Sequence, residues 1–242
     1  MKLPLAGLRL IVLGVSLLPA LAVAATPSIG RVSQMTGDRL GNAQAPGAPA
    51  RKLAAGDPVF AGERIRTGAG TVLQIEFTDK TRFTLGPDAE FEVSRYSHAT
   101  GGAAEQESFH SRIFKGAFRF VSGLVARTKR KDMRVSVSVA TIGIRGTHVE
   151  GEVIERREKD GVMVDASAKV ALLEPEGSDA PSAILVENQF GSVVIDKPGY
   201  GTEIPDEKSP PSPVKRMQLR TIDNLTRAIR SPARTGGPAR RP

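Results

Sequence analysis

Glutamates two residues apart are the feature of this chain that comes nearest to catalytic chemistry. Glu90 and Glu92 form one such pair, and Glu150 and Glu152 form another. On a β-strand, residues i and i+2 project from one face about 7 Å apart, which is loosely compatible with the acid and base of a glycosidase. The same spacing also arises on the solvated side of an amphipathic strand, and we favour this second interpretation.

No catalytic or metal-binding motif accompanies these glutamates. The sequence lacks a G-x-S-x-G elbow, an H-E-x-x-H motif, a P-loop and a dinucleotide fingerprint. Its histidines are His98, His110 and His148, and it has no cysteine, whereas structural zinc sites use three or four nitrogen or sulfur ligands. A Ser-His-Asp triad assembles from distant positions, but nothing distinguishes one serine. We therefore expect no catalytic residue, no metal and no cofactor, with an unrecognised hydrolase as the least favoured alternative.

A basic stretch offers binding chemistry instead. Arg127, Lys129, Arg130 and Lys131 stand just before the alternating residues 135–139. Such charges commonly belong to a solvated turn that keeps a strand end from pairing with other chains, and they also suit an acidic partner or an anionic glycan. Aromatic residues make up 5% of the chain and tryptophan is absent, so nucleic-acid bases would find few stacking platforms. We expect no nucleic-acid partner.

The first 24 residues have the order of a secretory signal peptide. Lys2 and Arg9 precede an apolar run over residues 10–21, and the triplet Ala-Val-Ala then allows cleavage before Ala25. The run is shorter than the roughly 20 apolar residues of a membrane span, which argues against an uncleaved anchor. We therefore predict a periplasmic or secreted protein. Because it has no cysteine, burial rather than disulfide bonds must hold it together.

The net charge of +8 is concentrated in the C-terminal tail. Residues 208–242 contain nine Lys or Arg against one Asp, which leaves residues 25–207 with 23 basic and 25 acidic residues. A basic tail is attracted to anionic membrane surfaces by about 1 kcal/mol per charge, and it is equally typical of a solvated extension. The second interpretation implies that removing residues 208–242 leaves the melting transition nearly unchanged.

Alternation of apolar and polar residues dominates the middle of the chain and predicts strands. Leu73, Ile75 and Phe77 share one face, and Asp79 follows in a turn where its side chain can accept hydrogen bonds from local backbone amides. Short strands bounded by Gly, Pro, Asp or Asn predict an all-β fold, an irregular sandwich or β-roll. The expected strands cover residues 72–77, 82–85, 91–95, 113–121, 135–139, 149–153, 162–164, 170–173, 184–186 and 192–195.

Other segments lack this alternation. Residues 41–50 and 97–106 are rich in small and polar residues and predict unstructured loops. Residues 208–213 predict a stiff linker, and residues 214–230 have the apolar spacing of a short helix. The expected organisation is a signal peptide over 1–24, an all-β domain over 25–207 with strands as far as 196, and a Pro/Arg-rich tail over 208–242.

Several separate motifs between residues 30 and 153 resemble the FecR-type domain, named for the ferric-citrate regulator. The segment LAAGDPV at 53–59 and the segment AGERIRTG at 61–68 are similar to the family's G-D-x-V and G-x-x-I-x-T-G. FKGAF at 114–118 and ATIGIRGT at 140–147 are similar to its later strands, while Asp79-Lys80 replaces the usual Asp-Gly turn. The matched positions are Gly56, Asp57, Arg66, Thr67, Gly68, Asp79, Gly116, Arg145, Gly146 and Thr147.

Among the matched residues, Arg145 is the one whose surroundings most clearly require a partner. It lies inside an apolar strand, where an unpaired guanidinium would be costly. We expect it to pair with a carboxylate or with backbone carbonyls, and we favour a structural role over contact with a ligand.

The resemblance implies a binding function. The founding members of the family are inner-membrane regulators whose cytoplasmic segment holds a sigma factor. Here a predicted signal peptide leads directly into the domain, so we expect the free-standing periplasmic form without sigma-factor binding. We expect a non-enzymatic module that binds another envelope protein in signalling or assembly, with an exposed sheet edge as one possible surface. A cell-wall or polysaccharide ligand, or an anionic membrane contacted through the basic stretch and tail, is the alternative.

Overall fold

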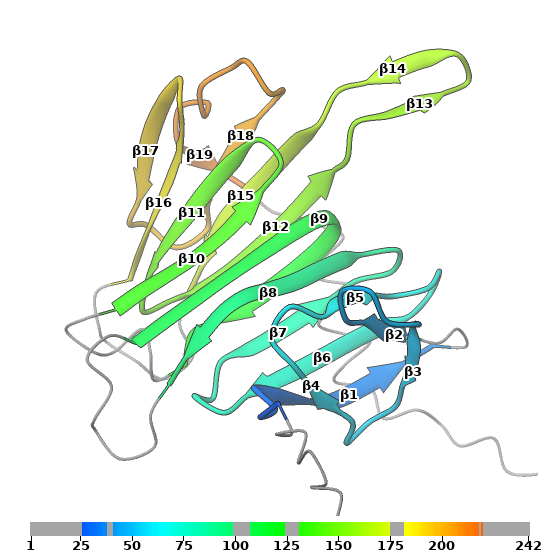
Figure 1. Cartoon of the computed structure of the whole chain (residues 1–242). Coiled ribbons are helices and arrows are strands. Elements are labelled where there is room, and N and C mark those ends of the chain that lie inside the picture. The colour runs from blue at the N-terminus through cyan, green and yellow to red at the C-terminus, as the bar shows by residue number, and fades with distance from the viewer. Residues whose placement is uncertain are drawn as a thin grey trace, which may run out of the picture.

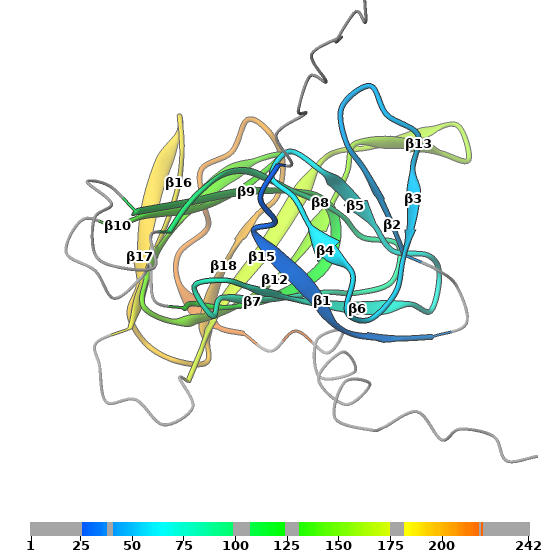
Figure 2. The ribbon, with the colours of Figure 1, turned by 60° about the horizontal axis from the view of Figure 1, so that its bottom comes forward.

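The computed structural model describes residues 26–37, 41–98, 107–123, 131–174, 182–217 and 219, and all regular structure in these residues is β-strand (Figure 1). Among them, no helix is long and apolar enough to cross a membrane. The predicted signal peptide over 1–24 lies outside the described residues. The predicted all-β fold is confirmed, and it has the form of an irregular two-layered sandwich (Figure 2).

The first sheet contains β1, β6 and β7 at one end and β12, β15 and β18 at the other. Neighbouring strands within this sheet are all antiparallel. Its strands in spatial order are β4 (Pro58–Val59), β1 (Gly30–Thr36), β6 (Val72–Phe77), β7 (Arg82–Leu85), the second half of β9 (Glu107–Val121), β12 (His148–Ile154), β15 (Ser167–Leu173), β18 (Tyr200–Ile204) and β19 (Lys215–Arg216).

The second sheet packs against the first and shares β9 with it. All its pairs are antiparallel except β9 with β10, which is parallel. Its strands in spatial order are β3 (Arg51–Leu53), β2 (Gly41–Gln44), β5 (Arg64–Arg66), β8 (Glu90–Ser97), the first half of β9, β10 (Lys131–Val137), β11 (Ala140–Arg145), β16 (Ala183–Asn188) and β17 (Gly191–Ile195). A separate ribbon of β13 (Arg157–Lys159) and β14 (Val162–Val164) projects from the body (Figure 1).

The bend of β9 at Gly116 joins the two sheets. Residues up to Lys115 pair with β8 in the second sheet, and residues from Gly116 pair with β12 in the first. Gly116 has a φ of 98°, and a Cβ at this position would lie 2.5 Å from the Cβ of Ala89. A glycine is therefore required both by the backbone conformation and by the close approach of Ala89 in the turn between β7 and β8.

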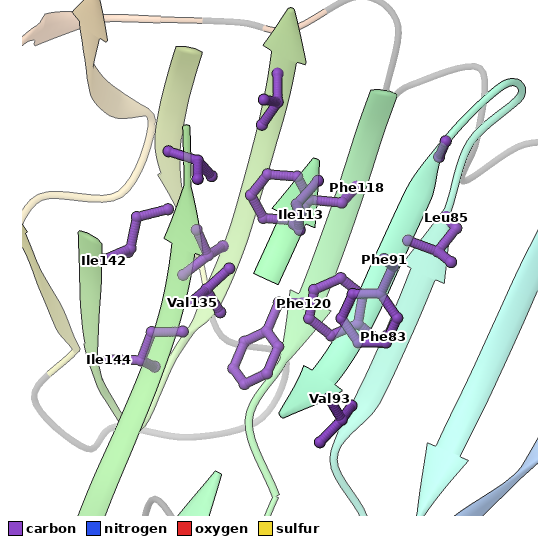
Figure 3. Packing of buried hydrophobic residues seen from close by; sticks show 14 of the residues in the cluster. Phe83, Leu85, Phe91, Val93, Ile113, Phe118, Phe120, Val135, Ile142 and Ile144 are labelled. Atoms are coloured by element: carbon purple, nitrogen blue, oxygen red, sulfur yellow. The ribbon is translucent and has the colours of Figure 1, made fainter. Parts of the chain in front are cut away.

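Alternating side chains from both sheets fill the core. Leu73, Ile75 and Phe77 are all buried, so the face predicted from their spacing is confirmed. Phe83 on β7 and Phe91 on β8 meet across the sandwich with ring centroids 4.3 Å apart (Figure 3). The aromatic side chains of this core are Phe77, Phe83, Phe91, Phe109, Phe118 and Phe120.

The prediction of a loop over residues 41–50 is wrong at its start. Residues 41–44 form β2, which pairs with both β3 and β5, and Ala43 is fully buried. A Cβ on Gly41 would lie 2.9 Å from Cδ1 of Leu73. This crowded position therefore needs small residues. The small residues that predicted a loop instead allow β2 to pack closely against its neighbours.

β-structure continues past the C-terminal boundary predicted at residue 207. β18 extends the domain beyond residue 196, and residues 215–216 form β19 instead of the start of the predicted helix over 214–230. The N–H of Ser212 donates to the carbonyl of Glu203 over 2.9 Å, and the Thr202 hydroxyl donates to the Ser212 carbonyl over 2.6 Å. Leu219 is buried. Residues 208–217 and 219 therefore pack on the sandwich, and residues from 220 lie outside the described part.

A chain ending at residue 207 is expected to be less stable than one ending at residue 219. It loses the burial of Leu219 and the two bonds of Ser212, which together stabilise by about 3 kcal/mol. Comparing the two truncated chains by chemical denaturation isolates this segment. Equal free energies of unfolding would show that the segment contributes nothing.

Candidate functional site

The residues that open the family resemblance form a turn against β1. Gly56 has a φ of 95°, and its N–H donates to the carbonyl of Val32 over 2.8 Å. Oδ2 of Asp57 accepts a hydrogen bond from the N–H of Ala54 over 2.8 Å. Both residues therefore shape the chain where it enters β4.

Thr67 links β5 to the turn between β7 and β8. Its buried hydroxyl donates to the carbonyl of Gly86 over 2.6 Å and accepts from the N–H of Ala89 over 2.9 Å. The guanidinium of Arg66 lies 3.1 Å from a glutamate of β8. The carbonyl of Gly68 accepts from the N–H three residues later over 3.1 Å. Thr67 and Arg66 therefore join β5 to the turn before β8 and to β8, and Gly68 closes the turn that leads to β6.

Asp79 is fully buried at the centre of a hydrogen-bond network. Its carboxylate accepts from the N–H of Thr81 over 3.1 Å and from the Thr81 hydroxyl over 2.6 Å, so the prediction that it bonds local backbone is confirmed. The Tyr96 hydroxyl lies 3.2 Å from the same carboxylate. Burial raises the pKa of Tyr96 above its ordinary value, so the phenol stays protonated and can donate.

The described residues supply no ion-pair partner for Arg145. Its side chain is exposed at the end of β11. Exposure to water removes the need for a partner. Its neighbour Thr147 is buried and bonds the hydroxyl of Ser182, and the intervening Gly146 has a φ of 58°.

The edges of the two sheets differ in how they are protected from pairing with other chains. The β4 edge has only two residues and contains Pro58. The β3 edge has three residues, including Arg51 and Lys52, and the β19 edge has two, both basic. Short length, proline and charge are the usual devices that stop an edge from adding a strand. Three of the four edges are therefore blocked.

The fourth edge, β17, has none of these devices. It has five residues, Gly-Ser-Val-Val-Ile, and within the described part of the chain its one ladder partner is β16. Val194 is 59% exposed, and Leu185 on β16 is also exposed beside it in the ladder. Val193 and Ile195 face the other way, toward the core. An uncharged edge with apolar side chains on both faces is suited to accept another strand.

Comparison with known proteins identifies the domain in which most of these residues lie. Residues 63–168 match the family model described as FecR protein. The chain carries a FecR domain. The match runs from the segment before β5 into β15 and includes all the later motif residues. Among curated proteins, none matches the chain significantly.

Two crystal structures resemble this chain. Both are of a protein from Parabacteroides distasonis that is provisionally described as an anti-sigma factor. Each is 13% identical, with a TM-score of 0.45 over 67% of this chain. The match covers 64% of one of those chains and 63% of the other. The chain thus spans less than two thirds of their length.

The paired glutamates have different surroundings in the FecR domain. Glu90 lies 3.2 Å from Arg64, and Glu92 lies 3.4 Å from the same guanidinium. Glu150 is buried opposite Arg119 in the register of β12 and β9, so it does not belong to a solvated face. Arg64 thus lies beside both members of the first pair, and Arg119 lies opposite one member of the second.

β10 begins with the last residue of the basic stretch, Lys131, and pairs with the part of β9 that carries His110. Outside the described residues lie the other members of the stretch, Arg127, Lys129 and Arg130. Next to Lys131, Oδ2 of Asp132 lies 2.7 Å from Nε2 of His110. Nδ1 of His98, just after β8, lies 3.0 Å from Oε1 of Glu107, the first residue of β9. Within the described ranges, no group of three His, Asp or Glu side chains is arranged to hold a metal.

The pKa of Asp132 predicts how this corner of the FecR domain responds to acid. Desolvation pushes the pKa of Asp132 upward, but the hydrogen bond and charge of His110 and the charge of Arg134 outweigh it and hold the pKa below 3.8. A carboxyl whose pKa is lower in the folded state contributes stability above its ordinary pKa. This contribution is lost as the pH falls through the lower, folded value.

An Asp132→Asn variant should therefore be less stable than the wild type at pH 7, and the difference should shrink below about pH 4. Denaturation curves over this pH range check the expectation. A stability difference that is constant from pH 7 to pH 2 would contradict it.

Proposed function

We propose that this chain is a non-enzymatic periplasmic module that binds another envelope protein in signalling or assembly. The FecR domain supports the signalling part of the proposal. The observation that carries the binding part is the unprotected β17 edge. In this proposal, an extended segment of the partner adds to β17 as a further strand.

Strand addition defines the chemistry of the partner segment. Its backbone would bond the N–H and C=O groups of β17 that β16, the one ladder partner among the described residues, leaves unused, and these bonds supply affinity while its alternating side chains supply specificity. On one face these side chains would lie beside Val194 and Leu185, which are exposed, and on the other beside Val193, which is half-buried. The segment that fits is uncharged, with apolar residues on both faces.

A Val194→Lys variant tests the proposal. The side chain is exposed, so the fold should be kept, while a lysine on an edge strand opposes strand addition. We expect binding of the partner to weaken about tenfold or more. The matched control is Val162→Lys on β14, which places the same charge at a position of 65% exposure away from β17.

The measurement has two steps. A photo-crosslinking residue at position 194 captures the partner in intact cells, and a synthetic peptide of the crosslinked segment is then added to the purified protein. Protection of the β17 amides from hydrogen exchange in the wild type, and its loss in Val194→Lys, is the expected result. Protection confined to other strands, or equal binding by both variants, would refute docking at β17.

A further inference from the structure

A groove with a volume of about 620 Å³ lies where the β10–β11 and β16–β17 turns meet. Its remaining walls come from β9, from Glu155 after β12 and from Glu207 after β18. Figure 1 shows both turns at the end of the molecule that also carries the loop after β18. This volume is within the range of about 300–1,000 Å³ typical of small-molecule sites.

Two phenylalanine rings line the groove from different elements. Phe190 in the β16–β17 turn is 45% exposed, which is unusual for a ring of this size in a turn. Phe114 on β9 is held by Arg64, whose guanidinium lies 4.0 Å from the ring centroid. Arg64 is itself fixed by Glu90, 3.2 Å away. The lining therefore contains two aromatic rings, and one of them is in contact with an arginine.

Other side chains of the lining can donate or accept hydrogen bonds. Ser136, Ser138 and Thr141 contribute hydroxyls, and Gln189 contributes an amide. Arg112 and Glu187 stand in one register row across the sheet, with Ser136 and Thr141 between them. Each hydroxyl both donates and accepts, so the lining matches a ligand whose own groups do the same.

The charges of the groove are largely balanced. Glu155 lies 3.5 Å from Lys115, and Glu207 lies 3.5 Å from Arg156. The lining also holds Arg112 and Glu187, which carry opposite charges. A site for an ion would concentrate one sign of charge, and this groove does not. Its ligand should be uncharged and polar.

Asn188 fixes the wall of the groove before any ligand arrives. Its Nδ2 donates to the carbonyl of Val139 over 3.2 Å and to that of Ser209 over 2.8 Å. Its Oδ1 accepts from the N–H groups of Phe190 and Gly191 over 3.0 and 3.2 Å. One side chain thus ties together three loops, which lowers the entropy that binding would otherwise cost.

We propose that this groove binds a short, uncharged oligosaccharide. The apolar C–H faces of the sugar rings would stack on Phe190 and Phe114, and their hydroxyls would bond the serines, Gln189 and Glu187. The groove lies on the β16 side of the sheet and the free edge of β17 faces away from β16, so this site is separate from the proposed protein-docking edge. The glycan could come from the cell wall or from another envelope polysaccharide.

Calorimetric titration of the mature protein with tetrasaccharides of N-acetylglucosamine, glucose and mannose tests the proposal, together with co-sedimentation on purified peptidoglycan. We expect saturable binding of at least one probe. Phe190→Ala and Glu187→Gln should each weaken this glycan binding about tenfold or more. Both side chains are exposed, so their loss leaves the core intact. Val194→Lys should bind glycan as the wild type does.

The result also separates the sources of the glycan. Binding of the N-acetylglucosamine tetrasaccharide and of peptidoglycan assigns the groove to the cell wall, and binding of a neutral hexose tetrasaccharide alone assigns it to another polysaccharide. Failure of every probe and of peptidoglycan to bind would overturn the proposal. Wild-type affinity in both groove variants, with their melting temperatures unchanged, would overturn it as well.

Discussion

Replacing Phe83 by alanine is expected to lower the free energy of unfolding by about 3–5 kcal/mol. Phe83 is fully buried, and its ring contacts those of Phe91, Phe118 and Phe120 at centroid distances of 4.3, 5.9 and 5.4 Å. Phe91 belongs to the opposite sheet, so the substitution opens a cavity between the layers. A loss of this size is a large part of the stability of a typical domain.

Phe190→Ala is the control for this substitution. It removes the same side chain from a position that is 45% exposed, where substitutions usually change stability by no more than about 0.5 kcal/mol. Urea denaturation of both variants checks the expectation. A Phe83→Ala protein as stable as Phe190→Ala would mean that the two sheets do not share this core.

Replacing Gly116 by alanine is expected to destabilise the protein by about 2–5 kcal/mol. The left-handed backbone conformation alone costs an alanine about 1–2 kcal/mol. In addition, the new Cβ would lie 2.6 Å from Cα of Ala89 and 2.5 Å from its Cβ, and such overpacking costs about 1–3 kcal/mol. Backbone on both sides of this contact leaves little room to yield.

Gly56→Ala separates the two contributions. Gly56 has nearly the same φ, 95° against 98°, but a Cβ there would meet nothing within 4 Å. The variant should therefore lose only the conformational contribution. Thermal and chemical denaturation of the two variants measure the difference, and equal losses would show that the contact with Ala89 is not strained.

The protein-binding and glycan-binding proposals concern different parts of the same half of the sandwich. The β17 edge offers unpaired backbone, and the groove offers rings and hydroxyls. Val194→Lys tests the first and Phe190→Ala tests the second, so the failure of one leaves the other intact.

The amino-acid sequence contained enough information to predict the strands of the central sheets. Residues 72–77 and 82–85 form β6 and β7 with the predicted limits, because one buried face imposes a two-residue period on any strand that covers a core. The turn position of Asp79 could also be predicted from local sequence, because its carboxylate accepts hydrogen bonds from a residue only two positions away.

The structure departs from the predictions that depended on distant neighbours. Small residues suggested a loop at 41–44, but Leu73 on another strand makes small residues necessary there. Residues 208–213 were predicted as a linker from their prolines, although Ser212 bonds β18. Arg145 was expected to need a partner because its strand is apolar, yet the strand turns its side chain outward.

The sequence by itself determined the all-β class, most strand positions and the motifs of the FecR domain, since each depends on residues a few positions apart. Only the tertiary structure decided that β9 crosses between sheets at Gly116, that β17 is the unprotected edge and that Phe114 and Phe190 face one groove. These features depend on which strands become neighbours. That pairing brings together segments far apart in the chain, such as β11 and β16, which no local pattern encodes.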